Sequence, residues 1–595
     1  MTKIVPHVSN VLIHFVGITK RISLHDISVK SFCCGFFLIT ETISVSLKNK
    51  CLLMKEYRPG QGISEYTTLL HGDVSGIQDF IFNVRSEGAA KTLKARSFFV
   101  QALATLCINM IEDRLGEENC LLFYNGGGGF SVFCKNLSEE TFADLQKTIQ
   151  SDLQDMEIYL TLSRAELDAQ DFSKTWNRIR RTARRDKLRK FINHQDAFTP
   201  QKRYKANDEH WKKFAGRLIR SQGFDDEGIP GAQKIVRDTI TLFGKHLRLT
   251  HEPKSQHRPD DINWHLPVWD RALMDMDATW MDYINRRNQK DDPDEEENNV
   301  RPGMIIDFET MGHFAKKRTG TDKIAVLKMD VDDLGVLFST VKHWDQSKKT
   351  SDALKYFFEQ ALLKLWQGGF TSGITGEHVS FQQTIYPIFS GGDDCLIIGA
   401  WDAVFEFALA VYKAFQSFMK SRLVELQLQK LPTLSAAIIV VDSRFPVVRM
   451  GALAEEALSL AKSAADGTKN RVFVFGKVLT WTEFEKAHSI ANNLERLIKV
   501  DNEPRSILQR IRSSHTGFEK QMRRAIEEGR IHNPAVWRLM YYIRQSKNKD
   551  SLQSIIEEYQ RALIEAVTKR IYTNADLFPV AARWAEFKTR KSDND

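Results

Sequence analysis

One arrangement of elements, a strand followed by helices and a glycine-centred hairpin, occurs twice in this sequence and constrains the fold most. The first copy runs from an apolar strand, 69–73, through helical sequence to a hairpin whose turn is the glycine run 126–129. The second copy begins with an apolar strand, 323–330, and reaches a hairpin about Gly391 and Gly392. Glycine between apolar runs predicts a hairpin because glycine adopts the positive φ angles of tight turns. The repeated order therefore predicts a duplicated domain.

The elements around each hairpin fit a ferredoxin-like βαββαβ layout. In the second copy we expect helices over 351–366, 403–428 and 453–465 and a strand over 433–441, and in the first copy the run 74–82 predicts entry into a helix. The sequence thus predicts an α+β fold with two ferredoxin-like palm domains of the polymerase and cyclase type, a helical linker domain and a C-terminal helical bundle. The expected domains are an N-terminal extension (1–68), a first palm with a degenerate site (69–200), a linker domain (201–302), a second palm with the Gly-Gly-Asp-Asp motif (303–483) and a C-terminal helical domain (484–595).

Composition limits the class of protein. A chain of 595 residues, 42% of them hydrophobic, exceeds what one core organises, so several domains are expected. The net charge of +8, from 84 basic and 76 acidic residues, does not by itself predict a nucleic-acid binder. The seven cysteines include no C-x-x-C pair, which predicts neither a disulfide framework nor a zinc site and favours a reducing cytoplasm. No early apolar run is long enough to span a bilayer, so we expect no membrane anchor and no export signal.

The first 53 residues lack helical periodicity and are rich in Ile, Val, Ser and Cys. They form a small strand-containing extension, or the protein starts at Met54, and the residues alone leave both open. His25-Asp26 is the one feature typical of an HD phosphohydrolase, and such a site needs several further His and Asp ligands. We therefore expect no HD nuclease.

Only the second copy carries acids at both chemically informative places. Asp330 ends its first strand, and Asp393 and Asp394 follow the hairpin glycines, where the first copy has glycines. A strand end and a neighbouring hairpin turn are adjacent in such a sheet, so Asp330 and Asp393 can hold a divalent cation, and Mg²⁺ prefers a few carboxylates plus phosphate oxygens. Metals held there lower the pKa of an attacking ribose 3′-hydroxyl and neutralise pyrophosphate leaving ATP. We predict that Asp330, Asp393 and Asp394 are catalytic and bind the metal.

Two details follow from local geometry. Successive strand side chains point to opposite faces, which ranks Asp393 above Asp394 as a metal ligand. Asp332 and Asp333 either take part in the site or cap the following helix. Lys462, on a helix near the site, can neutralise a triphosphate, with Lys469 or Arg471 as further candidates. A solvated helix face is the competing interpretation for each cation alone.

These motifs resemble the large subunit of type III CRISPR effector complexes, the Cas-ten family, and its Csm type more than its Cmr type. The resemblance covers roughly residues 69–595. It rests on Gly72–Phe82, Asp330–Gly335, Phe389–Asp394, Leu434–Ala437 with Ala461-Lys462, and Ala581–Phe587.

The resemblance implies a cyclic oligoadenylate synthase that is switched on when guide RNA pairs with a foreign transcript. ATP would bind between the palms with Mg²⁺ or Mn²⁺, and the first palm would hold an acceptor nucleotide near Ser75, Gly76 and the turn 126–129. Guide RNA, target RNA and other type III effector subunits are the implied partners. No cysteine cluster lies in 200–300, so the zinc of several members is not expected, nor is the DNase activity of members with an HD domain. The expected nucleotide-binding residues are Ser75, Gly76, Ser390, Gly391, Gly392, Lys462 and Lys469.

Two alternatives to this function remain open at the level of sequence. A diguanylate-cyclase-like enzyme would use the same turn, although the motif lacks the acid-then-Phe ending of that class. A scaffold subunit would have lost turnover, against which the retained acids and Lys462 argue. The basic run Arg178 to Lys190 either binds RNA phosphates or forms a solvated helix face.

Overall fold

The computed structural model describes most of the chain from Met54 onward, and these residues belong to one compact unit, Leu53–His257 with Asp261–Asp595. The extension 1–53, with His25-Asp26, and most of the expected linker domain lie outside the described residues. The described residues are 54–84, 89–153, 156, 158–189, 238–249, 267–291, 299–302, 304–372, 376–463, 467–515, 536–544, 546, 549–569 and 573–590.

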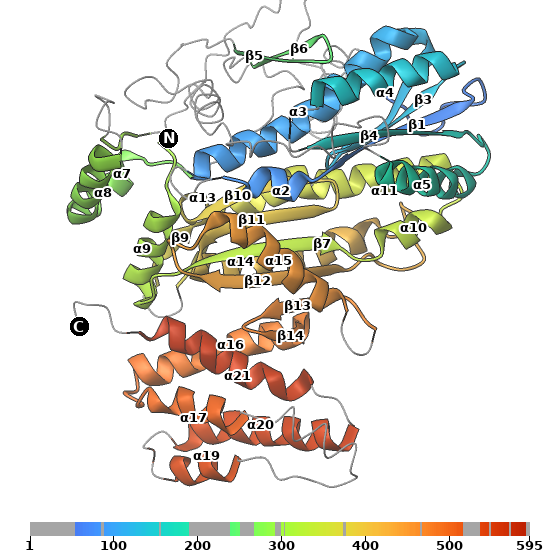
Figure 1. Cartoon of the computed structure of the whole chain (residues 1–595). Helices are drawn as coiled ribbons and strands as arrows, with labels where there is room; N and C mark the ends of the chain where they lie inside the picture. The colour runs from blue at the N-terminus through green and yellow to red at the C-terminus, as the bar shows by residue number, and fades with distance from the viewer. Residues whose placement is uncertain are drawn as a thin grey trace, which may run out of the picture. The chain divides into compact units, whose positions relative to one another are not determined.

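The first palm is a four-stranded antiparallel sheet in the order β2-β3-β1-β4, the order of a ferredoxin-like fold. Two helices, α3 and α4, cover one face, and α5 lies on the other (Figure 1). The helix expected in the run 74–82 is present and begins at Ile77, because strand β1 continues through Ser75, two residues beyond its expected end. The elements are β1 (Thr68–Ser75), α2 (Ile77–Phe82), α3 (Ala89–Leu115), β2 (Cys120–Gly126), β3 (Gly129–Cys134), α4 (Glu139–Leu153), β4 (Tyr159–Glu166) and α5 (Phe172–Leu188).

The second palm is a six-stranded sheet in the order β10-β11-β7-β12-β13-β14. Its first four strands repeat the order of the first palm, and β13 is added parallel to β12. Strand β7 is buried along almost its whole length, which explains its continuous apolar sequence. The strands are β7 (Ile324–Val331), β10 (Ile385–Gly391), β11 (Asp394–Ala400), β12 (Leu434–Val441), β13 (Arg471–Val474) and β14 (Lys477–Thr480).

The helices of the second palm differ from expectation at their ends. The helix expected over 351–366 begins earlier and contains a π-helical turn, and the one expected from 453 begins directly after Pro446. The helix expected over 403–428 spans Trp401–Arg422 and is followed by turns, in which Gln427 has a left-handed φ of 52°. The helices are α10 (Leu334–Thr340), α11 (Trp344–Tyr356), the π turn (Phe357–Ala361), α12 (Leu362–Trp366), α14 (Trp401–Arg422) and α15 (Val447–Lys462).

The two palms share a hydrophobic core. The segment that leaves β7 places Phe338, Val341 and Trp344 in the aromatic cluster of the first palm. The ring of Trp344 lies 4.9 Å from that of Phe133 and 5.2 Å from that of Phe123, centroid to centroid, both edge-on. The strand that carries Asp330 is therefore anchored in the other palm.

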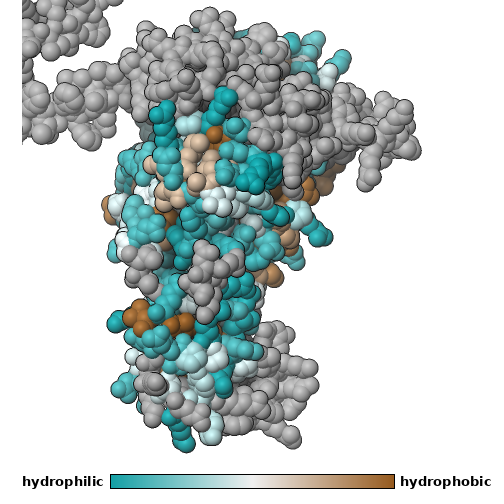
Figure 2. All heavy atoms as spheres, turned by 90° about the vertical axis from the view of Figure 1, so that its left-hand side faces the viewer, coloured by the Kyte–Doolittle hydropathy of each residue, from teal (hydrophilic) through white to brown (hydrophobic). Residues whose placement is uncertain are grey.

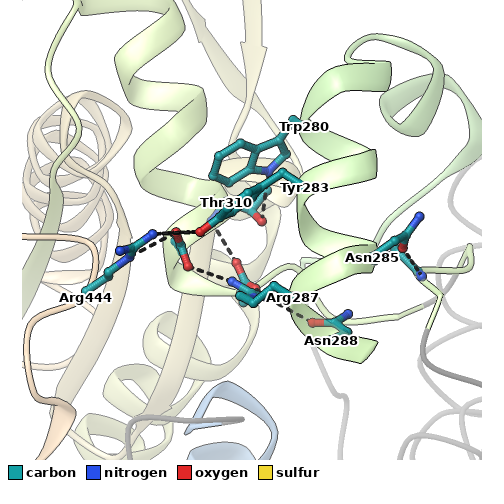
Figure 3. Close-up of polar contacts among 10 residues, drawn as sticks. Trp280, Tyr283, Asn285, Arg287, Asn288, Thr310 and Arg444 are labelled. Atoms are coloured by element: carbon teal, nitrogen blue, oxygen red, sulfur yellow. Dashed lines mark hydrogen bonds and ion pairs between the residues drawn. The ribbon is translucent and has the colours of Figure 1, made fainter. Parts of the chain in front are cut away.

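The described part of the linker from 267 onward packs on the second palm, whereas the hairpin of β5 (Asp238–Leu242) and β6 (Lys245–Leu249) contacts α3 of the first palm. Helix α8 (Ala278–Asp291) lies along α9 (Phe308–Thr319), and Figure 3 shows its polar contacts. Arg287 pairs with Glu309 at 2.7 Å, and Arg444, beyond β12, donates to the Tyr283 hydroxyl at 2.7 Å. The face that holds these helices is largely hydrophilic where it is coloured in Figure 2, with only small hydrophobic areas.

The C-terminal region is helical, as expected. Its first helix, α16, begins at Trp481 with a capping box of Thr480 and Glu483, three residues before the expected boundary. The last helix returns to the second palm, where the Thr321 hydroxyl donates to the Phe587 carbonyl at 2.7 Å. Within the described ranges no helix is long and apolar enough to cross a membrane. The helices are α16 (Trp481–Lys499), α17 (Ser506–His515), α19 (Val536–Ile543), α20 (Lys549–Lys569) and α21 (Thr573–Lys588).

Candidate active site

The sheet of the second palm brings the three predicted acids together. Asp330, near the end of β7, is the direct cross-strand partner of Asp394 on β11 and of Ser435 on β12. Direct cross-strand partners point to the same face of a sheet. Asp393 lies in the turn before β11, and its carbonyl accepts a hydrogen bond from the Val331 amide at 3.1 Å. The three acids therefore lie at the same end of one sheet, where β7 ends and β11 begins.

The acids repel one another when they are ionised. Burial raises the pKa of Asp394 to about 8, and the charges of Asp393 and Asp330 add to the rise. Burial also raises the pKa of Asp393 to about 6, with the charge of Asp330 adding and that of Lys462 opposing. The pKa of Asp330 is raised by burial as well, against the influence of Lys462. A site of this kind favours a cation.

The register removes the reason for ranking Asp393 above Asp394. That ranking assumed that alternation along the strand turns Asp394 away from Asp330, whereas the two are directly paired. Asp393 precedes the strand, so alternation does not decide its direction. Both carboxylates thus remain candidates on equal terms.

The helix-capping alternative for Asp332 and Asp333 is wrong. The Asp332 carboxylate accepts hydrogen bonds from the hydroxyls of Thr433 and Ser435, at 2.8 and 2.7 Å, and from the Asn470 amide at 2.9 Å. Asp333 occupies the N-cap position of α10 with a left-handed φ of 55°, but its side chain makes no capping bond. Asp332 instead ties β7 to β12 and to the loop before β13.

Two of the predicted triphosphate cations pair with acids of the motif. The Lys462 amine, at the end of α15, pairs with the Asp330 carboxylate. The Lys469 amine lies 2.5 Å from the Asp333 carboxylate. Arg471, also a candidate, is buried and hydrogen-bonds to the loop that precedes it. A bound triphosphate would compete with Asp330 for Lys462.

The donor set fits a metal that enters with a nucleotide better than a resident metal. In the part of the chain that the structure describes, no group of three or more His, Cys, Asp or Glu side chains could hold a metal ion. Mg²⁺, however, is commonly bound by one or two carboxylates together with substrate phosphates and water. Burial, and after it the charges of neighbouring acids, raises the pKa values of Asp393 and Asp394, and a bound cation would favour their ionised forms.

The first palm repeats this geometry without the hairpin acids. Asp73 on β1 is paired with Gly129 and Thr161, as Asp330 is with Asp394 and Ser435. The Asp73 carboxylate also pairs at 2.6 Å with Lys187 of α5, the helix that follows β4 as α15 follows β12. This Asp–Lys pair is the counterpart of Asp330 and Lys462, and the sequence reasoning missed it.

The backbone supports the same equivalence. The Val74 amide donates to the Gly128 carbonyl at 3.0 Å, as the Val331 amide does to Asp393. Gly76 has a left-handed φ of 81° at the place where the second palm has Asp333. The duplication is therefore confirmed, with glycines at 128 and 129 where the second palm has acids.

The turns of the two palms touch. A Cβ built on Gly392 would lie 3.2 Å from the Gly127 Cα, so the turn of the second palm needs glycine at this position for the close approach. The hydroxyl of Tyr124 and the carboxylate of Glu359 also lie near the second turn, since Cβ atoms on Gly392 and Gly391 would be 3.3 and 3.9 Å from them. No sequence signal marked these two side chains, because each comes from another element.

The remaining predicted nucleotide residues lie near the strand ends. Ser75 is the last residue of β1, and its buried hydroxyl makes no hydrogen bond with the described residues. Gly76 precedes α2. Ser390 donates its hydroxyl to the Phe358 carbonyl at 2.6 Å, which ties the hairpin to the π turn.

Three cations of the basic run on α5 have partners on other elements of the protein. Arg178 pairs with Glu166 at 3.1 Å, Lys187 pairs with Asp73, and Arg180 donates to the Gly335 carbonyl at 3.0 Å. Arg181, Arg184 and Arg189 of the same run are exposed, so the RNA-binding interpretation and the solvated helix face both remain open. Lys190 lies outside the described residues.

Two protein-family models match the regions of the two palms. Residues 323–473 match the Cas10/Cmr2 second palm domain, and residues 66–203 match domain B of the Csm1 subunit. The first range includes every predicted acid, and the second includes the glycine turn of the first palm.

Curated proteins and solved structures agree with these models. The chain is similar to proteins named CRISPR system single-strand-specific deoxyribonuclease Cas10/Csm1 (subtype III-A). The Methanocaldococcus jannaschii protein is 26% identical over 462 residues, 67% of this chain and 56% of the relative. The Thermococcus onnurineus protein is 26% identical over 491 residues, 74% of this chain and 59% of the relative. The chain thus spans less than two thirds of the length of either.

The fold is shared with solved Csm1–Csm4 cassettes. A cassette in complex with pppApA has a TM-score of 0.60 at 19% identity, and one in complex with cA4 has a TM-score of 0.60 at 18% identity. Each match covers 88% of this chain and 70% of the solved one. The expectation of no HD nuclease concerns residues outside the described ones and stays a prediction, as does the absence of zinc.

Proposed function

We propose that this chain, which belongs to the Cas10/Csm1 family of type III CRISPR large subunits, joins ATP molecules into cyclic oligoadenylates. The observation that carries the proposal is the cluster of Asp330, Asp393 and Asp394 beside Lys462, at the edge of a palm sheet. Solved relatives of the same fold that hold a linear adenylate and a cyclic one support it.

In this proposal the acids, the lysine and the hairpin glycines of the second palm have distinct roles. Mg²⁺ or Mn²⁺ bound by Asp330, Asp393 and Asp394, with phosphate oxygens, would lower the pKa of the attacking ribose 3′-hydroxyl and neutralise the leaving pyrophosphate. Lys462 exchanges the Asp330 carboxylate for the triphosphate of the incoming ATP. Gly391 and Gly392 allow the backbone to approach that nucleotide closely.

The first palm holds the acceptor nucleotide. Its Asp73–Lys187 pair stands where the second palm has Asp330 and Lys462, so Lys187 can neutralise acceptor phosphates in the same way. The hydroxyl of Ser75, which makes no hydrogen bond with the described residues, is a donor for such a ligand. Without hairpin acids this palm binds a nucleotide but does not activate one.

Synthesis is switched by RNA in this proposal. Guide RNA and the other type III effector subunits, Csm4 among them, are the proposed partners, and target RNA is the proposed activator. The test is incubation of the purified complex, with guide RNA and matching target RNA, with labelled ATP and Mg²⁺ or Mn²⁺, followed by mass analysis of the products. The variant to compare is the double substitution Asp393→Ala/Asp394→Ala.

The expected result is target-dependent adenylate oligomers that vanish in the double variant while assembly with RNA is retained. The control is Asp282→Ala, whose carboxylate on α8 is 71% exposed, and it should leave turnover unchanged. Consumption of GTP with ATP left intact would favour the diguanylate-cyclase-like alternative. No turnover of either nucleotide would favour the scaffold.

A further inference from the structure

A second ion pair joins helix α15 to the strand that carries Asp330. The Lys328 amine on β7 pairs with the Glu455 carboxylate on α15, and Lys462, seven residues further along that helix, pairs with Asp330. The Lys328 side chain is only 3% exposed, and a buried ammonium group is costly unless it is paired. The proposed reaction makes no use of this second pair.

Lys328 lies within reach of the acids. Side chains alternate along a strand, so Lys328 and Asp330 point to the same face of the sheet. On β11 the direct partner of Lys328 is Leu396 and that of Asp330 is Asp394. Lys328 and Asp394 are therefore diagonal neighbours, a separation of about 7–8 Å that a long side chain spans.

The first palm helps to hold Glu455. The side-chain amide of Gln78, in the first turn of α2, donates to the Glu455 carboxylate at 3.0 Å, at the oxygen that also binds Lys328. The Glu455 side chain is 50% exposed, so this bond orients a carboxylate that would otherwise turn toward solvent. The Lys328 amine is thus held toward α15.

The first palm has an equivalent contact between palms but lacks the ion pair. Arg180 of α5 takes the place of Glu455, seven residues before the lysine of its helix, and donates to the Gly335 carbonyl of the second palm at 3.0 Å. His71 takes the place of Lys328, two residues before the aspartate of its strand. An ion pair that only attached the helix to the sheet would serve equally well in the first palm. Of the two palms, the one with the hairpin acids is the one with the pair.

We propose that Glu455 is a positioning residue, which keeps the Lys328 amine away from the acids of the second palm and leaves them to a divalent cation. Without the Glu455 carboxylate the buried amine would turn to Asp330 and Asp394, where a fixed positive charge opposes the binding of a cation. The inference rests on the proposed function for the statement that these acids bind the cation, and it does not depend on turnover.

The test compares Glu455→Gln with Lys328→Met, with the double variant Lys328→Met/Glu455→Gln and with Glu56→Gln, all in the assembled complex. Glu56 is the matched control, because its side chain is also 50% exposed and pairs at 2.6 Å with a buried lysine, Lys348. Mn²⁺ affinity is measured by electron paramagnetic resonance with a non-hydrolysable ATP analogue. ATP turnover is measured as a function of Mn²⁺ concentration.

Glu455→Gln should lower the Mn²⁺ affinity by about 10-fold or more, the scale on which outer partners of metal ligands act. Its turnover should recover at high Mn²⁺ concentration, because the cation then displaces the amine. The double variant should restore the affinity and Lys328→Met alone should not lower it, since neither has an amine that can neutralise the acids. Glu56→Gln should match the unaltered protein. Gln78→Leu removes only the bond that orients Glu455, so it should lower the affinity in the same direction.

Unaltered Mn²⁺ affinity in Glu455→Gln, or in Gln78→Leu where Glu455→Gln does not assemble, would overturn the inference. Equal losses in Glu455→Gln, Lys328→Met and the double variant would also overturn it, because the ion pair would then only attach α15 to β7. If the unaltered complex consumes no ATP but the Mn²⁺ affinities follow the expected pattern, the inference stands and the proposed function fails.

Discussion

Gly392→Ala tests whether the contact between the two turns matters as the structure indicates. Gly392 has a φ of 69°, and an alanine Cβ there would lie 3.2 Å from the Gly127 Cα and 3.3 Å from the Gly127 amide nitrogen. Both neighbours are backbone atoms, so the clash is relieved only by moving one turn away from the other. Asp393 follows directly, so the movement displaces a predicted catalytic carboxylate.

The magnitude follows from two terms. A non-glycine residue in the left-handed region costs about 1–2 kcal/mol, and overpacking a tight contact costs about 1–3 kcal/mol more. Gly476→Ala is the matched control, because Gly476 has a φ of 78° with nothing within 4 Å of its Cβ position. Gly127→Ala is a second control, with a φ of 60° and its nearest neighbour at 3.5 Å, an ordinary contact. Both controls should lose only the stability that a non-glycine residue costs in the left-handed region.

The assays are urea unfolding followed by fluorescence and ATP turnover of the assembled complex. Gly392→Ala should lower the free energy of unfolding by about 2–5 kcal/mol, and both controls by about 1–2 kcal/mol. Turnover should fall by about 100-fold, the scale that a misplacement near 1 Å produces, while Gly476→Ala keeps turnover. Equal losses of stability in Gly392→Ala and Gly476→Ala would refute the reasoning, since the inter-palm contact would then contribute nothing.

Three other perturbations test the fold and the electrostatics. Arg318→Met removes the partner of the Asp402 carboxylate, which is 8% exposed and ion-paired at 2.7 Å, so the free energy of unfolding in urea should fall by about 3–5 kcal/mol. The control is Lys413→Met, whose side chain is 59% exposed, and it should cost less than about 1 kcal/mol. Asp394→Asn should raise the thermal midpoint more at about pH 9 than at about pH 5. The pKa of Asp394 in the folded protein, about 8, exceeds its ordinary value of 3.8, so the unaltered protein loses stability as the pH rises from 3.8 to about 8, whereas the Asn variant does not. An equal gain at both pH values would contradict this. Trp344→Ala should destabilise the first palm by about 3–5 kcal/mol, seen as faster hydrogen exchange in β2, and exchange confined to the second palm would contradict the shared core.

The sequence was sufficient to locate the acids because their signal is local. Asp330 ends an apolar strand, and Asp393 follows a glycine turn, so strand and turn chemistry identify both without knowledge of the packing. The duplication was predicted from the order of strands, helices and hairpins alone. Asp73 could have been found as well, since Asp73-Val74 and Asp330-Val331 both lie near the ends of corresponding strands.

Other features depend on contacts that no local pattern contains. Tyr124 and Glu359 look like ordinary residues of a strand and a helix, and their relation to the Gly391–Asp394 turn exists only once three elements meet. The ranking of Asp393 above Asp394 failed as an argument because the strand begins at Asp394, one residue later than alternation assumed. The prediction that Asp333 caps the helix was wrong because its carboxylate pairs with Lys469 and not with a helix amide.

The first palm packs against two elements that carry functional residues of the second palm. Trp344, beyond the strand of Asp330, is buried in the first palm, and Phe82 of the first palm packs so closely on α15 that a Cβ on Gly451 would lie 2.6 Å from its ring. Helix α15 ends at Lys462, which pairs with Asp330. A shift of one palm against the other therefore acts on the strand of Asp330 and on the helix of Lys462 at the same time. Because packed interfaces adopt discrete arrangements rather than deform continuously, a partner that binds one such arrangement would set the separation of Asp330 and Lys462 without touching either.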